Sequence, residues 1–241
     1  MPAPLIVIPA RMASTRLPGK PLADIAGQPM IAWMVEIAMR AGIGPVLVAA
    51  AEEEVAAAAR AAGAEAVLTN PDLPSGTDRI WAAALAHGGD HEVIVNLQGD
   101  MPTFRPKDLS AAVAALTPGA DIATLVSPST DPAEAANPNL VKAIVGADRR
   151  CLYFTRAPAP WGEGPIQRHV GLYVYRRAAL ARFVAAPPSA LELREKLEQL
   201  RALEMGMTIV AGEVADFPKG VDSPEDLALA RRVLGGSAGC A

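Results

Sequence analysis

The chain has 241 residues and a formal net charge of −4 at pH 7, and this acidic balance argues against general nucleic-acid binding, which requires a basic face. Hydrophobic residues make up 51% of the chain, enough to bury a sizeable core, whereas aromatic residues make up only 4% and leave few rings on which bases could stack. Two cysteines, Cys151 and Cys240, cannot form a disulfide framework, and with no long apolar run and no basic leader we expect a cytoplasmic protein without membrane insertion.

The first hundred residues alternate short apolar runs with longer alanine-rich stretches. We predict strands at 5–10, 45–50, 64–69 and 92–98, and helices at 29–42, 52–63 and 75–89. Apolar strands separated by helices indicate an α/β fold, in which a parallel sheet is covered on both faces. Because ligands bind at the carboxyl ends of the strands in such sheets, we expect the chemistry in the loops that follow the first and fourth strands.

The pattern changes in the second half, where fewer helices separate the strands. We predict strands at 121–127, 141–145, 151–155, 168–176 and 208–214, and helices at 191–206 and 223–234. This half is therefore expected to be β-rich. Since the sequence shows no internal repeat and no long linker, we expect a single domain over residues 1–241.

The segment "IPARMASTRLPGKPL" (8–22) places Arg11, Arg16 and Lys20 in one loop directly after the first strand. Backbone N–H groups in such a turn can bind phosphate oxygens, and the arginines and the lysine add positive charge. Three cations in one loop suit a triphosphate better than a single carboxylate. The alternative is a solvated loop whose cations pair with surface acids. It is not a Walker P-loop, because Pro21 follows the Gly-Lys pair and the upstream glycine is missing.

Two aspartates are candidate metal ligands. Asp100 follows a buried strand in "NLQGDMP", and Asp222 precedes the final helix in "KGVDSPEDL". Mg²⁺ prefers one or two carboxylates together with phosphate oxygens, so these residues fit phosphate chemistry. Each also has a structural alternative, because aspartate is common in Gly-Asp turns and next to helix N-termini.

A third group of polar residues lies in the second half. His169 in "QRHVGLYVYR" is in phase with Tyr173 and Tyr175 along a predicted strand, and Arg156 lies in the proline-rich loop "FTRAPAPW". A single histidine in a strand is more often structural than functional, and the same alternative holds for Arg156. The charges of "LEQLR" have helical spacing and would normally form a solvated face.

These segments together resemble one family, the CMP-KDO synthetases or 3-deoxy-manno-octulosonate cytidylyltransferases. The similarity extends in order from residue 5 to residue 234. It is carried by "IPARMASTRLPGKPL", "SGTDRI", "VNLQGD", "NPNLVK", "LYFTRAPAPW", "RHVGLYVYR", "LEQLR" and "GVDSPEDL". The resemblance implies a Rossmann-like nucleotidyltransferase sheet with helices on both faces and a smaller β-rich dimerisation subdomain. It also implies a homodimer that packs through about residues 150–185.

The resemblance further implies transfer of CMP from CTP to the anomeric hydroxyl of 3-deoxy-D-manno-octulosonate (KDO), with release of pyrophosphate, for lipopolysaccharide synthesis. The implied catalytic residues are Lys20, Arg11 and Asp100, and Mg²⁺ would be held by Asp100 and Asp222. The residues implied to bind the nucleotide are Pro9, Ala10, Arg11, Ser14, Arg16, Lys20, Ser75 and Arg79. Those implied to bind the sugar acid are Gln98, Arg156, His169, Tyr173, Glu198 and Gln199.

The sequence departs from the family pattern at two places. Met101 stands where many members have glutamate, and Ala50 and Ala51 stand where many have Thr-Asp. Both changes remove a carboxylate near the nucleotide or the metal. Two alternatives therefore remain at this point: a cytidylyltransferase for another ulosonic acid such as 8-amino-KDO, and a nucleotide-binding protein that has lost catalysis.

Overall fold

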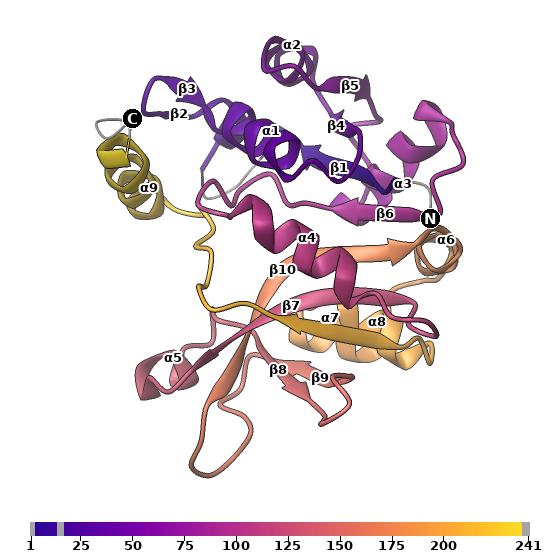
Figure 1. Cartoon of the computed structure of the whole chain (residues 1–241), viewed down its shortest axis with the longest axis vertical. Coiled ribbons are helices and arrows are strands. Elements are labelled where there is room, and N and C mark those ends of the chain that lie inside the picture. The colour runs from indigo at the N-terminus through magenta and orange to yellow at the C-terminus, as the bar shows by residue number, and fades with distance from the viewer. Residues whose placement is uncertain (1–2, 14–16, 238–241) are drawn as a thin grey trace. The chain divides into compact units, whose positions relative to one another are not determined.

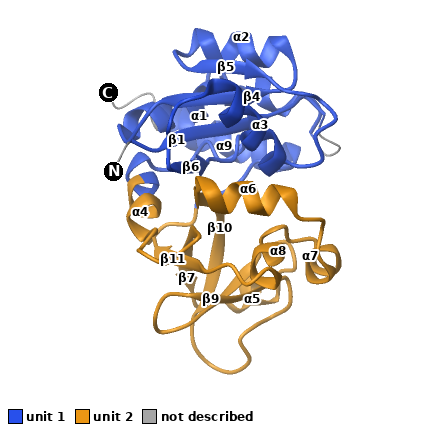
Figure 2. Ribbon diagram, turned by 90° about the vertical axis from the view of Figure 1, so that its right-hand side faces the viewer, with its two compact units in different colours: residues 1–109, 218–241 blue, residues 110–217 orange. Residues whose placement is uncertain are grey.

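The computed structural model describes residues 3–13 and 17–237. The chain forms two compact units, one built from residues 1–109 and 218–241 and the other from residues 110–217 (Figure 2). The expectation of a single domain over the whole chain stays a prediction, because the compactness of each unit does not decide whether they unfold together. Among the described residues, no helix combines the length and the apolar character needed to cross a membrane.

The first unit contains a parallel sheet of four strands in the order β6-β1-β4-β5 (Figure 1). The strands are β1 (Leu5–Ala10), β4 (Val46–Ala50), β5 (Glu65–Leu68) and β6 (Val93–Asn96). Apart from Asn96, the residues of β1 and β6 are apolar, and both strands are almost completely buried, as expected for strands covered on both faces. The predicted α/β fold with a parallel sheet is thereby confirmed, and the four predicted strands agree with the observed ones to within a few residues.

Three helices connect these strands: α1 (Met30–Ala41), α2 (Glu53–Ala61) and α3 (Gly76–His87). Strand order runs outward from β1 to β5 and then returns to β6 on the other side of β1. Because β-α-β crossovers are right-handed, α1 and α2 cover one face and α3 covers the other. Strands are thus added on one side of β1 first and on its other side afterwards, so the position between β1 and β6 is a topological switch point. At such a point the loops that follow the two strands run in opposite directions and leave a crevice.

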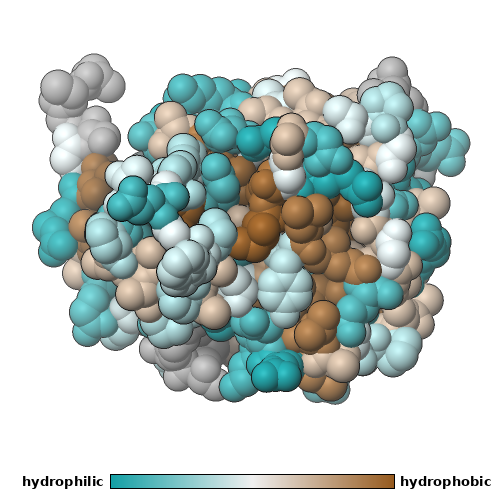
Figure 3. All heavy atoms as spheres, turned by 90° about the horizontal axis from the view of Figure 1, so that it is seen from below, coloured by the Kyte–Doolittle hydropathy of each residue, from teal (hydrophilic) through white to brown (hydrophobic). Residues whose placement is uncertain are grey.

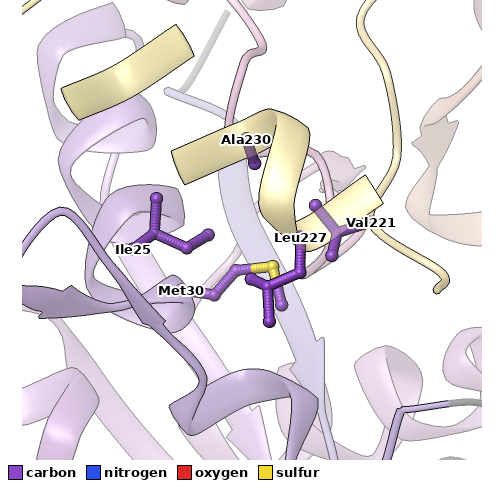
Figure 4. Packing of buried hydrophobic residues seen from close by; sticks show 5 residues of the cluster. All are labelled: Ile25, Met30, Val221, Leu227 and Ala230. Carbon is purple, nitrogen blue, oxygen red and sulfur yellow. The ribbon is translucent and has the colours of Figure 1, made fainter. Parts of the chain in front are cut away.

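The C-terminal segment completes the first unit. Helix α9 (Pro224–Ser237) packs on the small hairpin of β2 (Asp24–Ile25) and β3 (Gln28–Pro29), which follows the 3₁₀-helix η1 (Lys20–Leu22). A hydrophobic cluster holds it in place (Figure 4): Ile25, Met30, Val221, Leu227 and Ala230. Asp226 caps the helix, since its carboxylate accepts from the backbone N–H of Asp222 and Ser223 at 3.1 and 3.0 Å. The cluster and the cap fix the segment that carries Asp222.

The second unit is β-rich, as predicted. Its strands are β7 (Ile122–Ser129), β8 (Lys142–Val145), β9 (Cys151–Thr155), β10 (Ile166–Arg176) and β11 (Ile209–Glu213). β11 pairs with β7 in parallel, and the remaining pairs β7-β10, β10-β8 and β8-β9 are antiparallel. Cys151, the first residue of β9, is buried, and its burial raises the pKa of the thiol to about 12 against a lowering effect of Arg149.

The helices of the second half differ from the prediction. α5 (Pro132–Ala136), α6 (Arg177–Ala185) and α4 (Pro106–Ala115), which crosses the boundary between the units, were not predicted. The single helix expected at 191–206 is wrong, because α7 (Ala190–Glu195) and α8 (Gln199–Glu204) are separate helices. The chain breaks at Lys196, whose φ of +56° is left-handed and ends α7.

Candidate active site

A cavity of about 360 Å³ lies at the carboxyl ends of β1 and β6, entirely within the first unit. It is lined by Pro9, Ala10, Arg11, Ala13, Lys20, Pro21, Leu73, Ser75, Gly76, Arg79, Gln98, Gly99, Asp100 and Asp222. All the predicted nucleotide and metal residues that the structure describes are therefore in one place. Ser14 and Arg16, the other two predicted nucleotide ligands, lie outside the described residues.

Glycine is required where the two strand ends meet. A Cβ atom at Gly99 would lie 2.8 Å from the backbone oxygen of Pro9, closer than real Cβ contacts. Only a residue without a side chain allows the loop after β6 to pass this close to the end of β1. The close approach brings Asp100 to the same edge as the basic loop.

The centre of the cavity is a three-residue ionic cluster. The Lys20 ammonium donates to Asp100 Oδ2 at 2.8 Å and to Asp222 Oδ1 at 3.2 Å. Burial lowers the pKa of Lys20, but the charges and hydrogen bonds of the two aspartates outweigh this effect, so the pKa lies above its ordinary value of 10.5. Lys20 is therefore positively charged at any working pH. The three residues come from segments about 80 and 200 positions apart in the chain.

Backbone bonds shape the basic loop around Lys20. Gly19, with a left-handed φ of +71°, begins η1 and donates its N–H to the backbone oxygen of Met12 at 3.1 Å. The N–H of Met12 in turn donates to the carboxylate of Glu52 at 3.0 Å. These bonds close the base of the loop and place Lys20 at the start of η1, while Arg11 is exposed on the cavity wall.

Ser75 and Arg79 line the cavity but already have protein partners. Ser75 caps α3 by accepting from the N–H groups of Thr77 and Asp78, both at 3.1 Å. The buried guanidinium of Arg79 donates to the hydroxyl of Thr69 at 2.5 Å and to the backbone oxygen of Asn70 at 3.2 Å. Burial, followed by the charge of Arg11, lowers its pKa. Their assignment to nucleotide binding stays a prediction, and the geometry indicates that Arg79 acts by shaping the loop at 69–71.

Gln98 also lies in this cavity, next to Asp100. Its amide nitrogen donates to the side-chain oxygen of Asn96 at 3.0 Å. The amide oxygen of Gln98, Oε1, is an acceptor and therefore points away from Asn96. Asn96 is completely buried, and its own amide nitrogen has no hydrogen-bond partner among the described residues. Asn96 was not among the predicted site residues, although it belongs to the segment "VNLQGD" that carried the family resemblance.

The remaining predicted sugar ligands lie in the second unit. Arg156 follows β9, and its Nε and Nη1 donate to the backbone oxygens of Glu195 and Pro138, each at 3.1 Å. His169 and Tyr173 share one face of β10, with ring centroids 5.5 Å apart. β10 is irregular between Val170 and Tyr173, where it contains two more residues than the paired part of β7. Because side chains alternate between the two faces of a strand, an insertion of two residues leaves His169 and Tyr173 on the same face.

His169 is neutral and has a defined tautomer. Burial lowers its pKa to about 3. The hydroxyl of Thr124 donates its only proton to the backbone oxygen of Leu172 at 2.7 Å, so His169 Nε2, 3.0 Å from that hydroxyl, must be the donor in their bond. Nδ1 then remains as an acceptor. Burial also raises the pKa of Tyr173 well above 10, so its phenol is neutral.

Glu198 and Gln199 lie at the start of α8, just after the break at Lys196. The buried Arg201 fixes this arrangement with two bonds to Glu192 of α7 at 2.8 and 2.6 Å. Burial alone would raise the pKa of Glu192, but its hydrogen bonds with Arg201 and Ser189 outweigh this and the pKa is lowered. The ion pair therefore stays charged and holds α7 and α8 together in the bend that a single helix would not allow.

Comparison with known proteins gives the family. A model of the cytidylyltransferase family matches residues 5–209. A relative from Parvibaculum lavamentivorans, named 3-deoxy-manno-octulosonate cytidylyltransferase, is 61% identical and covers 96% of this chain and 92% of its own length. The chain belongs to the 3-deoxy-manno-octulosonate cytidylyltransferase family. A further cytidylyltransferase of this name, from Rhodospirillum rubrum, is 57% identical over 97% of the chain and 96% of its own length.

Solved structures agree with this assignment. The structure of a CMP:2-keto-3-deoxy-manno-octonic acid synthetase complexed with CTP is 39% identical, covers 98% of this chain and 99% of its own, and has a TM-score of 0.92. HddC from Yersinia pseudotuberculosis, at 15% identity and a TM-score of 0.68, shares the fold. The resemblance found in the sequence is thus confirmed, together with the Rossmann-like α/β class.

The departures at Met101 and Ala51 lie outside the cavity lining. Met101 is buried, and Ala51 continues from β4 and donates its N–H to the backbone oxygen of Ala10 at 3.0 Å. Asp100 and Asp222 are thus the cavity carboxylates that could hold a divalent cation. Their donor set fits such an ion, because two carboxylates already share one cationic partner in an open, polar cavity.

Proposed function

We propose that this protein transfers CMP from CTP to the anomeric hydroxyl of 3-deoxy-D-manno-octulosonate and releases pyrophosphate. The observation that carries this proposal is the ionic cluster of Lys20, Asp100 and Asp222 at the switch point of the sheet, in a chain 61% identical to a cytidylyltransferase of that name. The product, an activated sugar acid, would serve lipopolysaccharide synthesis. Because CTP is an intracellular nucleotide, we place the reaction in the cytoplasm.

The chemistry requires positioning and charge stabilisation rather than a protein nucleophile. The anomeric oxygen forms a bond to the α-phosphorus, the bond from that phosphorus to the pyrophosphate oxygen breaks, and the hydroxyl proton leaves to solvent. Negative charge grows on the leaving pyrophosphate during this step. Lys20 and Arg11, which line the cavity, are suited to bind that charge, and Pro9 and Ala10 offer backbone groups to the cytosine.

We further propose that Asp100 and Asp222 hold Mg²⁺ when CTP is bound. The ion would neutralise phosphate charge and ease deprotonation of the attacking hydroxyl. Lys20 bonds both carboxylates, so it satisfies two acids that would otherwise repel each other. On nucleotide binding, the same ammonium can exchange these carboxylates for phosphate oxygens.

The residues proposed to contact the sugar acid are Gln98, Arg156, His169, Tyr173, Glu198 and Gln199. Arg156 supplies a cation for the carboxylate, whereas Nδ1 of His169 and the carboxylate of Glu198 supply acceptors for hydroxyl groups. Tyr173 and Gln199 complete the proposed set with neutral groups. Neutral and anionic acceptors suit a polyhydroxylated substrate, and one arginine suits its single negative charge.

A homodimer is proposed through about residues 150–185. Leu152 of β9 is 61% exposed and Trp161 in the following loop is 100% exposed, unusual values for large apolar side chains. Figure 3 shows apolar surface gathered on the face seen from below, the side of β8 and β9 in Figure 1. A second copy of the chain would remove this surface from water.

The direct test is pyrophosphate release from CTP, Mg²⁺ and KDO, compared with the same assay on sialic acid, 8-amino-KDO and the other nucleoside triphosphates. Release with CTP and KDO alone would support the proposal. Release with CTP and a different sugar acid would keep the transfer chemistry and change the substrate. A folded protein that binds CTP but releases no pyrophosphate with any acceptor would contradict it and favour a non-catalytic role.

A further inference from the structure

Lys142, the first residue of β8, is an unusual residue because its side chain is completely buried. Its ammonium donates to three backbone oxygens, those of Asn137 and Leu140 at 2.9 Å and that of Arg156 at 2.8 Å. An ammonium has three N–H donors, so every donor has an acceptor. A buried lysine is tolerated only with such complete bonding, since an unpaired charge there would be very costly.

Glu195, the last residue of α7, bonds the same stretch of chain. Its carboxylate accepts from the hydroxyl of Thr155 at 2.9 Å and from the backbone N–H of Arg156 at 3.1 Å. Its own backbone oxygen accepts from Nε of Arg156 at 3.1 Å. The main chain of Arg156 is therefore bonded to an ammonium at its oxygen and to a carboxylate at its N–H. Charge-assisted bonds of this kind are stronger than neutral ones.

The side chain of Arg156 is held by two backbone oxygens, that of Glu195 at Nε and that of Pro138 at Nη1. Its Nη1 donates to the backbone oxygen of Pro138, in the short loop 137–140 whose ends Lys142 also bonds. With Nε and Nη1 bonded, the guanidinium cannot rotate freely. Among the residues that the structure describes, no acceptor contacts Nη2, which is thus available to a ligand.

We infer that Lys142 and Glu195 are positioning residues that fix Arg156 so that the free edge of its guanidinium receives the carboxylate of the sugar acid. The inference rests on the proposed function, in which Arg156 binds that carboxylate. Lys142 and Glu195 were not among the predicted site residues, and both are inferred to act by holding Arg156 in place. Fixing the arginine before binding avoids the entropy cost of ordering a long side chain when the substrate arrives.

A double-mutant cycle tests this inference. The variants are Glu195→Gln, Arg156→Ala and the pair combined, with KM measured separately for KDO and for CTP. Glu195→Gln keeps the size of the side chain but lacks the second carboxylate oxygen, so one of its two hydrogen bonds to Thr155 and Arg156 is lost. We expect KM for KDO to rise about tenfold while KM for CTP stays within about twofold. In the Arg156→Ala background, Glu195→Gln should cause no further rise, since both act through one group.

Lys142→Gln provides a second measurement on the other partner. If it folds, it should raise KM for KDO in the same selective way and lose this effect when Arg156 is alanine. If Lys142→Gln does not fold, the KM values of Glu195→Gln with and without Arg156→Ala decide whether the inference holds. The matched control is Glu134→Gln, which removes the charge of another half-buried carboxylate in the same unit, bonded to Arg168 at 3.1 Å, and should leave KM for KDO unchanged.

The outcomes separate the inference from the function on which it rests. Equal effects of Glu195→Gln with and without Arg156, or no effect on KM for KDO, would overturn the positioning role while the assignment of Arg156 stands. An Arg156→Ala variant with an unchanged KM for KDO would overturn the assignment of Arg156 itself, and the inference with it.

Discussion

Two lysines, one in each unit, use their charge in opposite ways. In the first unit, Lys20, Asp100 and Asp222 bond one another in an open cavity, with 29% and 46% of the two aspartate side chains exposed. In the second unit, Lys142 bonds only backbone oxygens and is completely buried. The Lys20 ammonium can exchange its carboxylate partners for those of a ligand that enters the cavity. The Lys142 ammonium is buried and bonded only to the backbone, so it keeps its partners.

This difference suits the two kinds of binding that the proposed reaction requires. The reacting phosphates need groups that are free to follow the charge as it moves to the leaving pyrophosphate, and the cluster around Lys20 can do so. Recognition of a sugar acid needs fixed donors and acceptors at set positions, as the bonded Arg156 and the single tautomer of His169 provide. We therefore expect substitutions of Lys20, Asp100 and Asp222 to act mainly on kcat, and substitutions of Arg156 and His169 to act mainly on the KM of the sugar acid.

The largest effect is expected at Lys20. Lys20→Met removes the cation proposed to bind the leaving pyrophosphate and leaves Asp100 and Asp222 without a shared partner. We expect kcat to fall about 10³-fold, as for the loss of a single transition-state donor in other enzymes. Steady-state pyrophosphate release measures this. Lys107→Met, at an exposed position of α4, is the control, and a fall below tenfold for Lys20→Met would contradict the proposed role.

The next effect concerns the proposed metal ligands. Asp100→Asn and Asp222→Asn each lower the charge of the site, so we expect kcat to fall about 10²-fold and the Mg²⁺ concentration for half-maximal rate to rise. A titration with Mg²⁺ at saturating CTP measures both. The exposed Asp90→Asn should leave the titration unchanged. An unaltered metal dependence in both site variants would rule out these residues as ligands.

A third prediction concerns stability and the buried His169. Its pKa is about 3 in the folded chain and 6.5 for an exposed histidine, so below pH 6.5 the unfolded chain binds the additional proton and folding is disfavoured. Stability from this residue is therefore complete above pH 6.5 and falls as pH decreases toward 3. At pH 5 the loss is about 2 kcal/mol in the free energy of unfolding.

Denaturant unfolding at pH 7 and pH 5 checks this loss. His169→Gln cannot titrate, so the decrease between the two pH values should be smaller by about 2 kcal/mol than in the native chain. Gln167→Asn, which replaces one neutral amide by another on the same strand, is the control and should leave the decrease unchanged. Identical pH dependence in the native chain and His169→Gln would refute a neutral, buried imidazole.

The smallest effect is expected at the proposed dimer interface. Trp161→Ser replaces a fully exposed indole, and we expect the dissociation constant of the dimer to rise about tenfold with kcat little changed. Sedimentation over a range of concentrations measures this change. Leu193→Ser, at an exposed leucine of α7 outside residues 150–185, serves as the comparison. If the native chain sediments as a monomer at all concentrations, the proposal of a homodimer is wrong.

Much of the first unit could be predicted because each element carries a local signal. The strand at 5–10 is a continuous apolar run, and Gly42 ends α1 with a left-handed φ of +64°. The break between α7 and α8 could not be predicted in this way, since the residues around Lys196 favour helix. It depends on tertiary bonds, chiefly the pair of Arg201 with Glu192.

The same distinction applies to the site. Arg11, Lys20 and Asp100 follow strands that end at one edge of a sheet, so their sequence positions indicated a shared site. Lys142 and Glu195 gave no such signal, because a lysine in a strand and a glutamate in a charged helix are ordinary on a surface. Their role became visible only through the distances that join them to Arg156.

The buried Cys151 has a practical consequence. A thiol with a pKa of about 12 is almost entirely protonated at neutral pH, and its burial keeps alkylating reagents away. In a chain with Cys240 replaced by serine, the labelling rate at this thiol would follow the opening of β9 and its surroundings. Compared with the rate of global unfolding, it would report whether the second unit opens by itself or only together with the rest of the chain.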